Sequence, residues 1–401
     1  MDEYIPYVAG RKYTAATAVL EPMAATEPMN AIDAYIQYIG HLTPYEQAEI
    51  DRYDGEVYYV GAGTVKIEGE EGAPQNCGFD DEDGRYIALP NGQVAYRYKL
   101  LECVGRGAYS DCYRAFDFKG GGEVVIKIIR SGEDFLRQSK IETSLLGELR
   151  SHDADDQYNV VHMKDSMVFR GHAVITFEKL GGTLLNDLMV AGVGGLKIPA
   201  IRRIARDVLQ CLQLLDRLGI VHGDLKPENI LHRPAPGGAE KRVKLIDFGN
   251  ACHKHSNVNT YVQSRFYRSP EIVLGVRYGP PIDIWSLGCV LVELASIRPL
   301  FQARNNEDLI ILITELLGLP PEDVLSRGEK SWDYFHAAGT PLRRKDSRGT
   351  HHTEGGRQLE DVLKDTTYPD FLDFLRRCLT WDPDKRITAA EGLKHPFLLE
   401  A

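Results

Sequence analysis

The sequence predicts an α+β fold in which a strand-rich half of the chain precedes a helix-rich half. Residues 98–104, 111–116 and 124–130 are short β-like runs bounded by turn residues. Beyond about residue 195 the apolar residues recur at three- and four-residue spacing, which is typical of amphipathic helices. Because the two patterns occupy separate stretches, we expect a β-rich lobe and a helical lobe with a ligand site between them.

The region before the first of these strands has a different composition. Residues 1–40 are rich in Ala, Thr, Pro and Tyr without sustained periodicity, which predicts a flexible N-terminal arm. Thr43 and Pro44 have the residue types of an N-cap and a first helical position, and residues 56–60 look like a strand. Residues 41–96 are therefore expected to form a small accessory region ahead of the main domain.

Two segments dominate the helical half. The second of them lies between Pro281 and Pro299. The first follows Pro199, and its apolar face is formed by Ile201, Ile204, Ala205, Val208, Leu212 and Leu215.

Composition restricts the classes of partner. The formal net charge of −11 over 401 residues argues against nucleic acid or an anionic membrane as a main partner, since both attract basic surfaces. Seven cysteines are scattered without a CxxC pair, so neither a disulfide framework nor a zinc site is indicated. The longest apolar stretch, residues 282–297, is interrupted by Asp283 and Glu293, so no membrane span is expected. We expect a monomer of the cytoplasm and the nucleus.

A glycine-rich turn and a lysine mark the strand-rich half. Residues 105–110 read Gly-Arg-Gly-Ala-Tyr-Ser between two strand patterns, where backbone N–H groups can approach phosphate oxygens. An ordinary β-turn remains the alternative for this stretch alone. Lys127 lies inside an apolar strand, and a buried ammonium needs anionic partners. Glu142, on the helical segment 135–149, is the candidate carboxylate, and a solvated helix glutamate is the alternative.

The decisive motifs lie in the helical half. Residues 222–229 read His-Gly-Asp-Leu-Lys-Pro-Glu-Asn, and residues 247–249 read Asp-Phe-Gly after the predicted strand 243–246. Asp224, Lys226 and Asn229 can face one phosphoryl group, and Asp247 can add a metal ligand from a neighbouring loop.

With these motifs in order, residues 97–398 resemble a protein kinase. The resemblance implies the two-lobed protein-kinase fold, with an N-lobe over residues 97–180 and a C-lobe over residues 181–398. It also implies ATP and Mg²⁺ as cofactors and protein substrates that carry Ser or Thr, because Lys226 stands where serine/threonine kinases have a lysine.

The same resemblance implies a role for each residue. Asp224 would accept the substrate hydroxyl proton, and Lys226 would steady the γ-phosphate. Lys127, oriented by Glu142, would hold the α- and β-phosphates. The metal would be held by Asn229 and Asp247. The remaining nucleotide contacts would come from the phosphate loop, the gatekeeper Phe177, the hinge backbone and the floor of the adenine site, namely Val104, Gly105, Gly107, Ser110, Cys112, Glu178, Leu180 and Leu231.

The activation segment narrows the resemblance to one family. Residues 260–271 closely resemble the activation loop of the dual-specificity tyrosine-regulated (DYRK) kinases, which makes Tyr261 the expected autophosphorylation site. Arg265 and Arg268 are expected to clamp its phosphate. By the same comparison Glu271 is expected to form a buried ion pair with Arg386.

Other segments resemble the same family. Residues 42–50 and 58–65 are similar to the accessory domain of the second DYRK subclass, and residues 79–86 are similar to the DYRK homology box. Residues 320–369 match the insert of the wider CMGC group. The family resemblance also implies that proline follows the phosphorylated residue.

Several positions depart from the family pattern. Ser110 replaces the third glycine of the phosphate loop, Cys112 replaces a valine, and Asn259 replaces a tyrosine. Gly223 stands where many kinases have the arginine that binds the loop phosphate. Ser110 and Asn259 keep open a rival reading, in which the chain is a pseudokinase that serves as a scaffold.

Two further positions concern the hinge and substrate selection. Lys179 replaces a hydrophobic hinge residue and is expected to face solvent. Asn186, with Asp187 beside it, stands where an acidic residue would read an upstream arginine. A metal site at residues 252–255, which read Cys-His-Lys-His, lacks complementary ligands, so a solvated loop is favoured.

Overall fold

The computed structural model describes residues 23–234, 241–254, 262–337, 339–363 and 368–399. These residues divide into two compact units. The first comprises the described part of Met1–Gly78 together with Ala88–Glu102 and Arg114–Val124. The second comprises Phe79–Ile87, Cys103–Tyr113 and the described residues from Val125 onward.

The first unit contains short helices around a small apolar core. Helix α2, Pro44–Asp51, begins with the predicted cap, because Thr43 and Glu46 form a reciprocal capping box and Pro44 occupies the first turn. Helix α1, Ala31–Tyr38, is followed by the 3-10 turn η1, Ile39–His41, and α3 is the single turn Pro74–Cys77. The core consists of Ala34, Leu42, Ile50, Val57, Val60 and Tyr96.

Two expectations for the first unit were wrong. Helix α1 lies within the stretch that we expected to lack regular structure. Its Ile32 and Ile36 are 70% and 68% exposed, so its most hydrophobic residues do not mark the buried face. The residues that pack on the core are instead Ala31, Ala34, Tyr35 and Tyr38. The run 56–60 is not a strand, because only Val57 forms an isolated bridge, with Met29. A strand needs a neighbour along its whole length, and this run has none.

A six-stranded sheet has the order β1-β2-β3-β4-β6-β5. Its strands are β1 Gln93–Val94, β2 Tyr98–Arg106, β3 Ser110–Asp117, β4 Gly122–Ile129, β5 Met163–Phe169 and β6 His172–Glu178. The three predicted strands are confirmed as β2, β3 and β4, with β4 ending at Ile129, one residue before the predicted end. Strands β5 and β6 form an antiparallel pair that we did not predict as strands.

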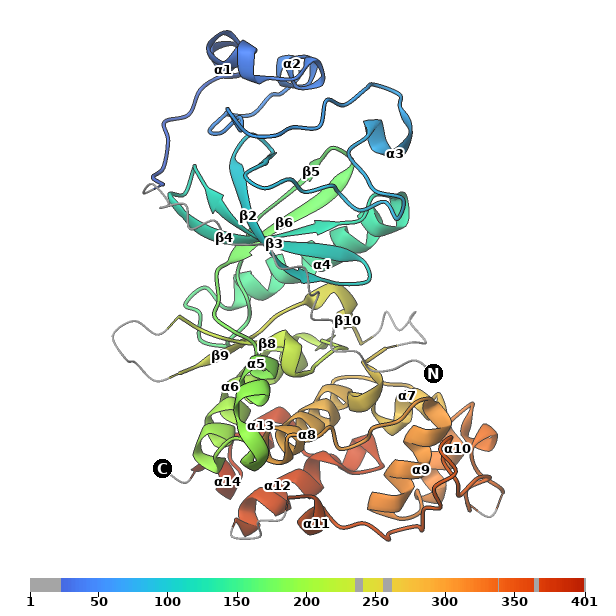
Figure 1. Cartoon of the computed structure of the whole chain (residues 1–401). Helices are drawn as coiled ribbons and strands as arrows, with labels where there is room; N and C mark the ends of the chain where they lie inside the picture. Colours follow the sequence, from blue (N-terminus) through green and yellow to red (C-terminus); the bar gives the residue numbers. More distant parts are fainter. Residues whose placement is uncertain (1–22, 235–240, 255–261, 338, 364–367, 400–401) are drawn as a thin grey trace. The chain divides into compact units, whose positions relative to one another are not determined.

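Helices make up most of the second unit. Helix α4, Glu133–His152, packs beside β5 and β6 and contains the predicted segment 135–149 (Figure 1). The two predicted long helices are confirmed as α6, Ile198–Leu218, and α8, Pro281–Ser296. The other helices are α5 Leu184–Val190, α7 Pro270–Leu274, α9 Asn306–Leu317, α10 Glu322–Arg327, α11 Leu359–Leu363, α12 Pro369–Cys378, α13 Ala389–Gly392 and α14 Pro396–Leu399.

Short strand pairs and 3-10 turns carry the loops that matter for function. Strand β7, Ile220–Val221, pairs with β10, Cys252–His253, and β8, Ile230–His232, pairs with β9, Val243–Leu245. The 3-10 turns are η2 Gly192–Gly194, η3 Pro227–Asn229, η5 Phe248–Asn250, η6 Arg265–Tyr267, η7 Ser331–Asp333 and η8 Pro383–Lys385.

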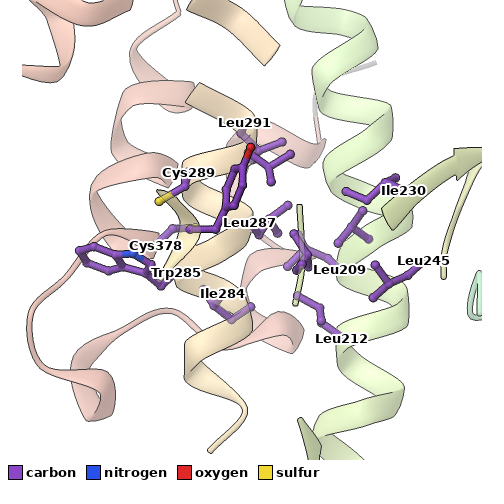
Figure 2. Packing of buried hydrophobic residues seen from close by; sticks show 14 of the residues in the cluster. Leu209, Leu212, Ile230, Leu245, Ile284, Trp285, Leu287, Cys289, Leu291 and Cys378 are labelled. Atoms are coloured by element: carbon purple, nitrogen blue, oxygen red, sulfur yellow. The ribbon is translucent and has the colours of Figure 1, made fainter. Parts of the chain in front are cut away.

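The main core of the second unit lies between α6 and α8. Figure 2 shows Leu209 and Leu212 of α6 facing Ile284 and Leu287 of α8. A Cβ atom at Gly288 would lie 2.9 Å from Cys378 Cβ, so only glycine lets α12 pack this closely on α8. Among the described residues, no helix is both long and apolar enough to cross a membrane.

The predicted ion pair between Glu271 and Arg386 is confirmed. The two Nη atoms of Arg386 lie 2.6 and 3.0 Å from the Glu271 carboxylate oxygens, and both side chains are fully buried. The guanidinium also donates to the carbonyls of Thr380 and Pro281. This network ties the start of α7 to the loop before α13.

Arg386→Met should lower the free energy of unfolding by about 3–5 kcal/mol, because it leaves the Glu271 carboxylate buried without its partner. Urea unfolding, followed by circular dichroism, measures the change. Arg377→Ala is the matched control, because Arg377 pairs with Asp373 at 3.0 Å on the surface and should contribute little. Equal effects of the two substitutions would contradict the assignment.

Candidate active site

The centre of the candidate site is the ammonium group of Lys127 on β4. Its Nζ donates to Glu142 Oε1 at 2.7 Å and to Asp247 Oδ1 at 2.9 Å. Burial disfavours the charge on Lys127, but Asp247 and Glu142 outweigh burial and raise its pKa above the ordinary value. The structure thus brings Lys127 together with its predicted partner Glu142, and it adds Asp247, which we predicted as a metal ligand and not as a partner of this lysine.

The two carboxylates differ in their electrostatics. Lys127 lowers the pKa of Asp247 to about 2, so this carboxylate is ionised at neutral pH. Burial raises the pKa of Glu142, although Lys127 opposes the shift. The Asp247 side chain is 40% exposed, whereas that of Glu142 is 3% exposed. Asp247 is thus the carboxylate that a ligand can reach.

The turn after β9 explains the glycine that follows Asp247 and Phe248. Asp247 has a φ of 62°, a left-handed conformation that aspartate tolerates better than most residues. A Cβ atom at Gly249 would lie 3.2 Å from Asp247 Oδ1 and 3.3 Å from Lys127 Nζ. Because Gly249 has no side chain, the charged groups of Asp247 and Lys127 are not crowded at this position.

The loop from His222 to Asn229 gathers a second group of polar side chains. Asp224 Oδ2 accepts from Lys226 Nζ at 2.7 Å, and Asn229 Nδ2 donates to the Asp224 carbonyl at 2.9 Å. Asp224 Oδ1 accepts from Ser264 Oγ at 2.8 Å. Sequence analysis gave Ser264 no role, because nothing in its neighbourhood of the sequence points to a contact 40 residues away.

A buried carboxylate on α8 anchors this loop. Asp283 accepts the backbone N–H groups of His222 and Gly223, at 2.7 and 3.0 Å. Burial raises the pKa of Asp283, and the His222 ring and the two N–H donors oppose the shift. Sequence analysis noted Asp283 only as an interruption of an apolar stretch, and that interruption was the available signal for a buried functional carboxylate.

Gly223 is required by the shape of the same loop. Its φ is 76°, and a Cβ atom there would lie 2.9 Å from Val262 Cγ1 and 3.1 Å from the Asn250 carbonyl. A side chain at this position would need a strained backbone and a shift of its neighbours. The missing arginine is therefore a consequence of local packing.

The predicted phosphate loop joins β2 to β3. Val104 and Gly105 lie in β2, and the N–H of Gly107 donates to the Ser110 carbonyl at 2.8 Å, which closes the turn. Cys112 follows on β3, where burial raises the pKa of its thiol to about 12, so the thiol stays protonated. Nucleotide binding by these residues stays a prediction.

Comparisons with known proteins place this site in a family. A family model for the protein kinase domain matches residues 98–398. Dual specificity tyrosine-phosphorylation-regulated kinase 4 of Homo sapiens is 40% identical over 370 residues, which cover 92% of this chain and 70% of that protein. The chain belongs to the DYRK family of protein kinases.

Other members of the family are longer than the matched region. The rat dual specificity tyrosine-phosphorylation-regulated kinase 3 is 37% identical over 390 residues, and the chain spans 65% of it. A putative kinase 3 homolog of Drosophila melanogaster is 39% identical over 382 residues, and the chain spans 45% of it.

The predicted hinge of this DYRK-family chain contacts a buried lysine through Glu178. Phe177 and Glu178 end β6, and Glu178 Oε1 accepts from Lys244 Nζ at 2.5 Å and from the His162 N–H at 2.8 Å. The Lys244 side chain is fully buried and also pairs with Asp156 at 2.8 Å. Lys244 was not among the predicted site residues, although a lysine inside the short apolar strand β9 is the same signal that indicated Lys127.

Two other residues were predicted to line the hinge and the adenine site, Leu180 and Leu231. Leu180 is half-buried, and Leu231 of β8 forms an isolated bridge with Thr183. Lys179 is exposed, as predicted. Their contacts with adenine stay predictions.

The position expected to read an upstream arginine is occupied by a helix cap. Asn186 forms a capping box with Thr183 at the start of α5. The neighbouring Asp187 accepts from His232 Nε2 at 2.7 Å. Both side chains are thus already used within the fold.

Tyr261 and Asn259 lie outside the described residues, so the predicted phosphate clamp stays a prediction. The guanidinium of Arg268 is buried and donates to the carbonyls of Val262 and Gln263 and to Asn306 Oδ1. Arg265 donates to the Arg304 carbonyl at 2.6 Å. Arg268 therefore shapes the backbone just after Tyr261.

The oxygen ligands fit a magnesium ion. Asp247 presents an ionised, partly exposed carboxylate, and Asn229 uses its Nδ2 toward Asp224, which leaves Oδ1 as its acceptor. The backbone N–H of Ile246 donates to the Asn229 carbonyl at 2.9 Å, so the two segments lie side by side. Carboxylate and amide oxygens are ligands that Mg²⁺ accepts, so these two residues would hold it.

Proposed function

We propose that the chain transfers the γ-phosphate of ATP, with Mg²⁺, to serine or threonine in protein substrates, and that it phosphorylates its own Tyr261. The observation that carries the proposal is the ion cluster of Lys127, Glu142 and Asp247, assembled beside a loop that presents Asp224. Family membership supports the reaction class.

In the proposed reaction Asp224 acts on the substrate hydroxyl. Its Oδ1 already accepts the Ser264 hydroxyl, so its geometry suits an O–H donor. The substrate oxygen forms a bond to the γ-phosphorus as the bond to the β,γ-bridging oxygen breaks, Asp224 takes the proton, and ADP leaves. Lys127 binds the α- and β-phosphates, and Lys226 balances charge near the transferred group. Bound Mg²⁺ would neutralise phosphate charge.

Asp224→Asn should reduce phosphate transfer by at least about a hundredfold, because an amide cannot accept the proton. Transfer from radiolabelled ATP to a basic peptide with a Ser-Pro site measures the rate, and a nucleotide-binding measurement shows that the variant is folded. Undiminished turnover would refute the role of Asp224. A wild-type chain that binds ATP with Mg²⁺ and incorporates no phosphate anywhere would favour the scaffold reading.

The activation segment supports a preference for proline after the phosphorylated residue. Gln263 has a φ of 67°, and its carbonyl accepts from Arg268 Nη2 at 2.7 Å. The Gln263 side chain accepts a hydrogen bond from the Ser269 N–H and donates one to Ser286 Oγ, and these two bonds fix the left-handed backbone of Gln263. The Gln263 carbonyl, next to Ser264, already accepts from Arg268. The backbone N–H of the substrate residue that follows the phosphorylated serine or threonine would therefore find no acceptor there. Proline has no N–H to lose.

The kcat/KM for a Ser-Pro peptide should exceed that for the Ser-Ala peptide by about tenfold, the cost of one unpaired donor. A peptide with N-methylalanine after the serine should match the proline peptide, since it also lacks the N–H. Equal rates for the alanine and proline peptides would contradict the proposal. A slow N-methylalanine peptide would indicate instead that the site recognises the proline ring.

Tyr261 should carry phosphate on protein made in a bacterial host, where the chain itself is the expected tyrosine kinase. Peptide mapping by mass spectrometry locates the phosphate. The Asp224→Asn protein, made in the same way, should have unmodified Tyr261 and is the control for modification by the host. A wild-type enzyme that is fully active with unmodified Tyr261 would reject autophosphorylation as a requirement.

We also propose that the chain acts as a monomer in the cytoplasm and the nucleus. All seven cysteines are free thiols, which is consistent with a reducing compartment.

A further inference from the structure

The segment 79–86 forms a rigid turn in the second unit. Asp81 Oδ1 accepts the N–H groups of Asp83 and Arg85 at 3.0 and 2.8 Å, and the Asp81 N–H donates to the Arg85 carbonyl at 2.9 Å. The Gly84 carbonyl accepts the N–H of Ser131 at 2.9 Å. The backbone that carries the Arg85 side chain is therefore fixed.

Arg85 reaches from this turn to the tip of the phosphate loop. Its Nη1 donates to Asp111 Oδ1 at 2.6 Å, and its Nη2 donates to the carbonyls of Gly107 and Ala108 at 2.8 and 3.3 Å. The Asp111 side chain is only 6% exposed, so the ion pair is partly shielded from water. The planar guanidinium suits this simultaneous contact with a carboxylate and two carbonyls.

Arg130, just after β4, contacts the same tip. Its backbone N–H donates to the Tyr109 carbonyl at 3.0 Å, and its Nη1 lies 3.4 Å from the Ala108 carbonyl. The guanidinium also donates to the Asp83 carbonyl in the turn. Three consecutive carbonyls, those of residues 107–109, are thus bound by Arg85 and Arg130.

The direction of these carbonyls determines the direction of the N–H groups. In a planar trans peptide the C=O of one residue and the N–H of the next point to opposite sides. Binding the carbonyls of residues 107–109 to the two arginines therefore turns the N–H groups of Ala108, Tyr109 and Ser110 away from Arg85 and Arg130. A set of N–H groups that face one way is what a phosphate-binding loop requires.

We propose that Arg85 is a positioning residue that presets the tip of the phosphate loop for the phosphates of ATP. The inference rests on the proposed kinase function and adds a role for the segment 79–86 in nucleotide binding. An unrestrained glycine-rich tip loses conformational entropy when it closes on a ligand. A tip that Arg85 already holds in place loses less entropy, so ATP should bind more tightly.

The test compares ATP with adenosine, because adenosine lacks the groups that the loop tip contacts. Arg85→Ala should raise the Kd of ATP with Mg²⁺ by about fivefold to tenfold, the range for one ordinary intramolecular hydrogen bond. The Kd of adenosine should change less than about twofold. Titration calorimetry on the full chain measures both constants. In turnover the KM for ATP should rise more than kcat falls.

Two further variants keep the test valid if Arg85→Ala does not fold. Arg85→Lys keeps the charge beside Asp111 but cannot span both carbonyls, and Asp111→Asn removes the ion pair. Both should weaken ATP binding relative to adenosine. The exposed Arg377→Ala is the control and should leave both constants unchanged.

The possible results separate this inference from the proposed function. An unchanged ratio of ATP to adenosine affinity in Arg85→Ala, or in the two milder variants, overturns the role of Arg85 while kinase activity stands. A wild-type chain that does not bind ATP overturns both.

Discussion

The arrangement of the candidate site depends on one constraint, which is that the buried ammonium group of Lys127 must have negatively charged partners. Lys127 has 11% of its side chain exposed, and an unpaired charge at that depth would be costly. Its two partners come from α4 and from the turn after β9, which are 15 and 120 residues away in the chain. The chain can therefore satisfy Lys127 only by bringing strand, helix and loop together. The same arrangement exposes Asp247 toward a ligand and sequesters Glu142.

The sequence predicted the residues that carry chemistry better than the residues that position them. Lys127 stands in an apolar strand and Asp247 in the Asp-Phe-Gly motif, and both patterns indicate a charged group that needs a partner. Glu142 was then predicted as the carboxylate of the next helical segment that could pair with Lys127. Asp283 and Ser264 contact the same site, but their partners are 40 or more residues away, and residue type alone does not name a distant partner. Helix α1 was missed for a different reason, because its isoleucines face solvent while alanines and tyrosines pack on the core, so the most hydrophobic residues do not mark the buried face.

One departure from the family pattern, Gly223, is linked to the activation segment through its backbone conformation. Gly223 has a left-handed backbone, and a side chain there would press on Val262. Val262 in turn presents its carbonyl to Arg268. The loop that carries Asp224 can therefore pack closely against the activation segment because residue 223 has no side chain. An arginine at position 223 would have to displace this contact, so any binding of a phosphate on Tyr261 must come from other residues.

One physical device appears in both the phosphate loop and the activation segment. A guanidinium binds two successive backbone carbonyls, those of Gly107 and Ala108 for Arg85 and those of Val262 and Gln263 for Arg268. In each case the effect on a ligand follows from the peptide geometry. In the phosphate loop the opposite faces of the peptides offer N–H groups to an anion. In the activation segment the Gln263 carbonyl already accepts from Arg268, and the proposed preference for proline rests on this contact. Arginine suits both tasks because its charge does not titrate and its donors lie in one plane.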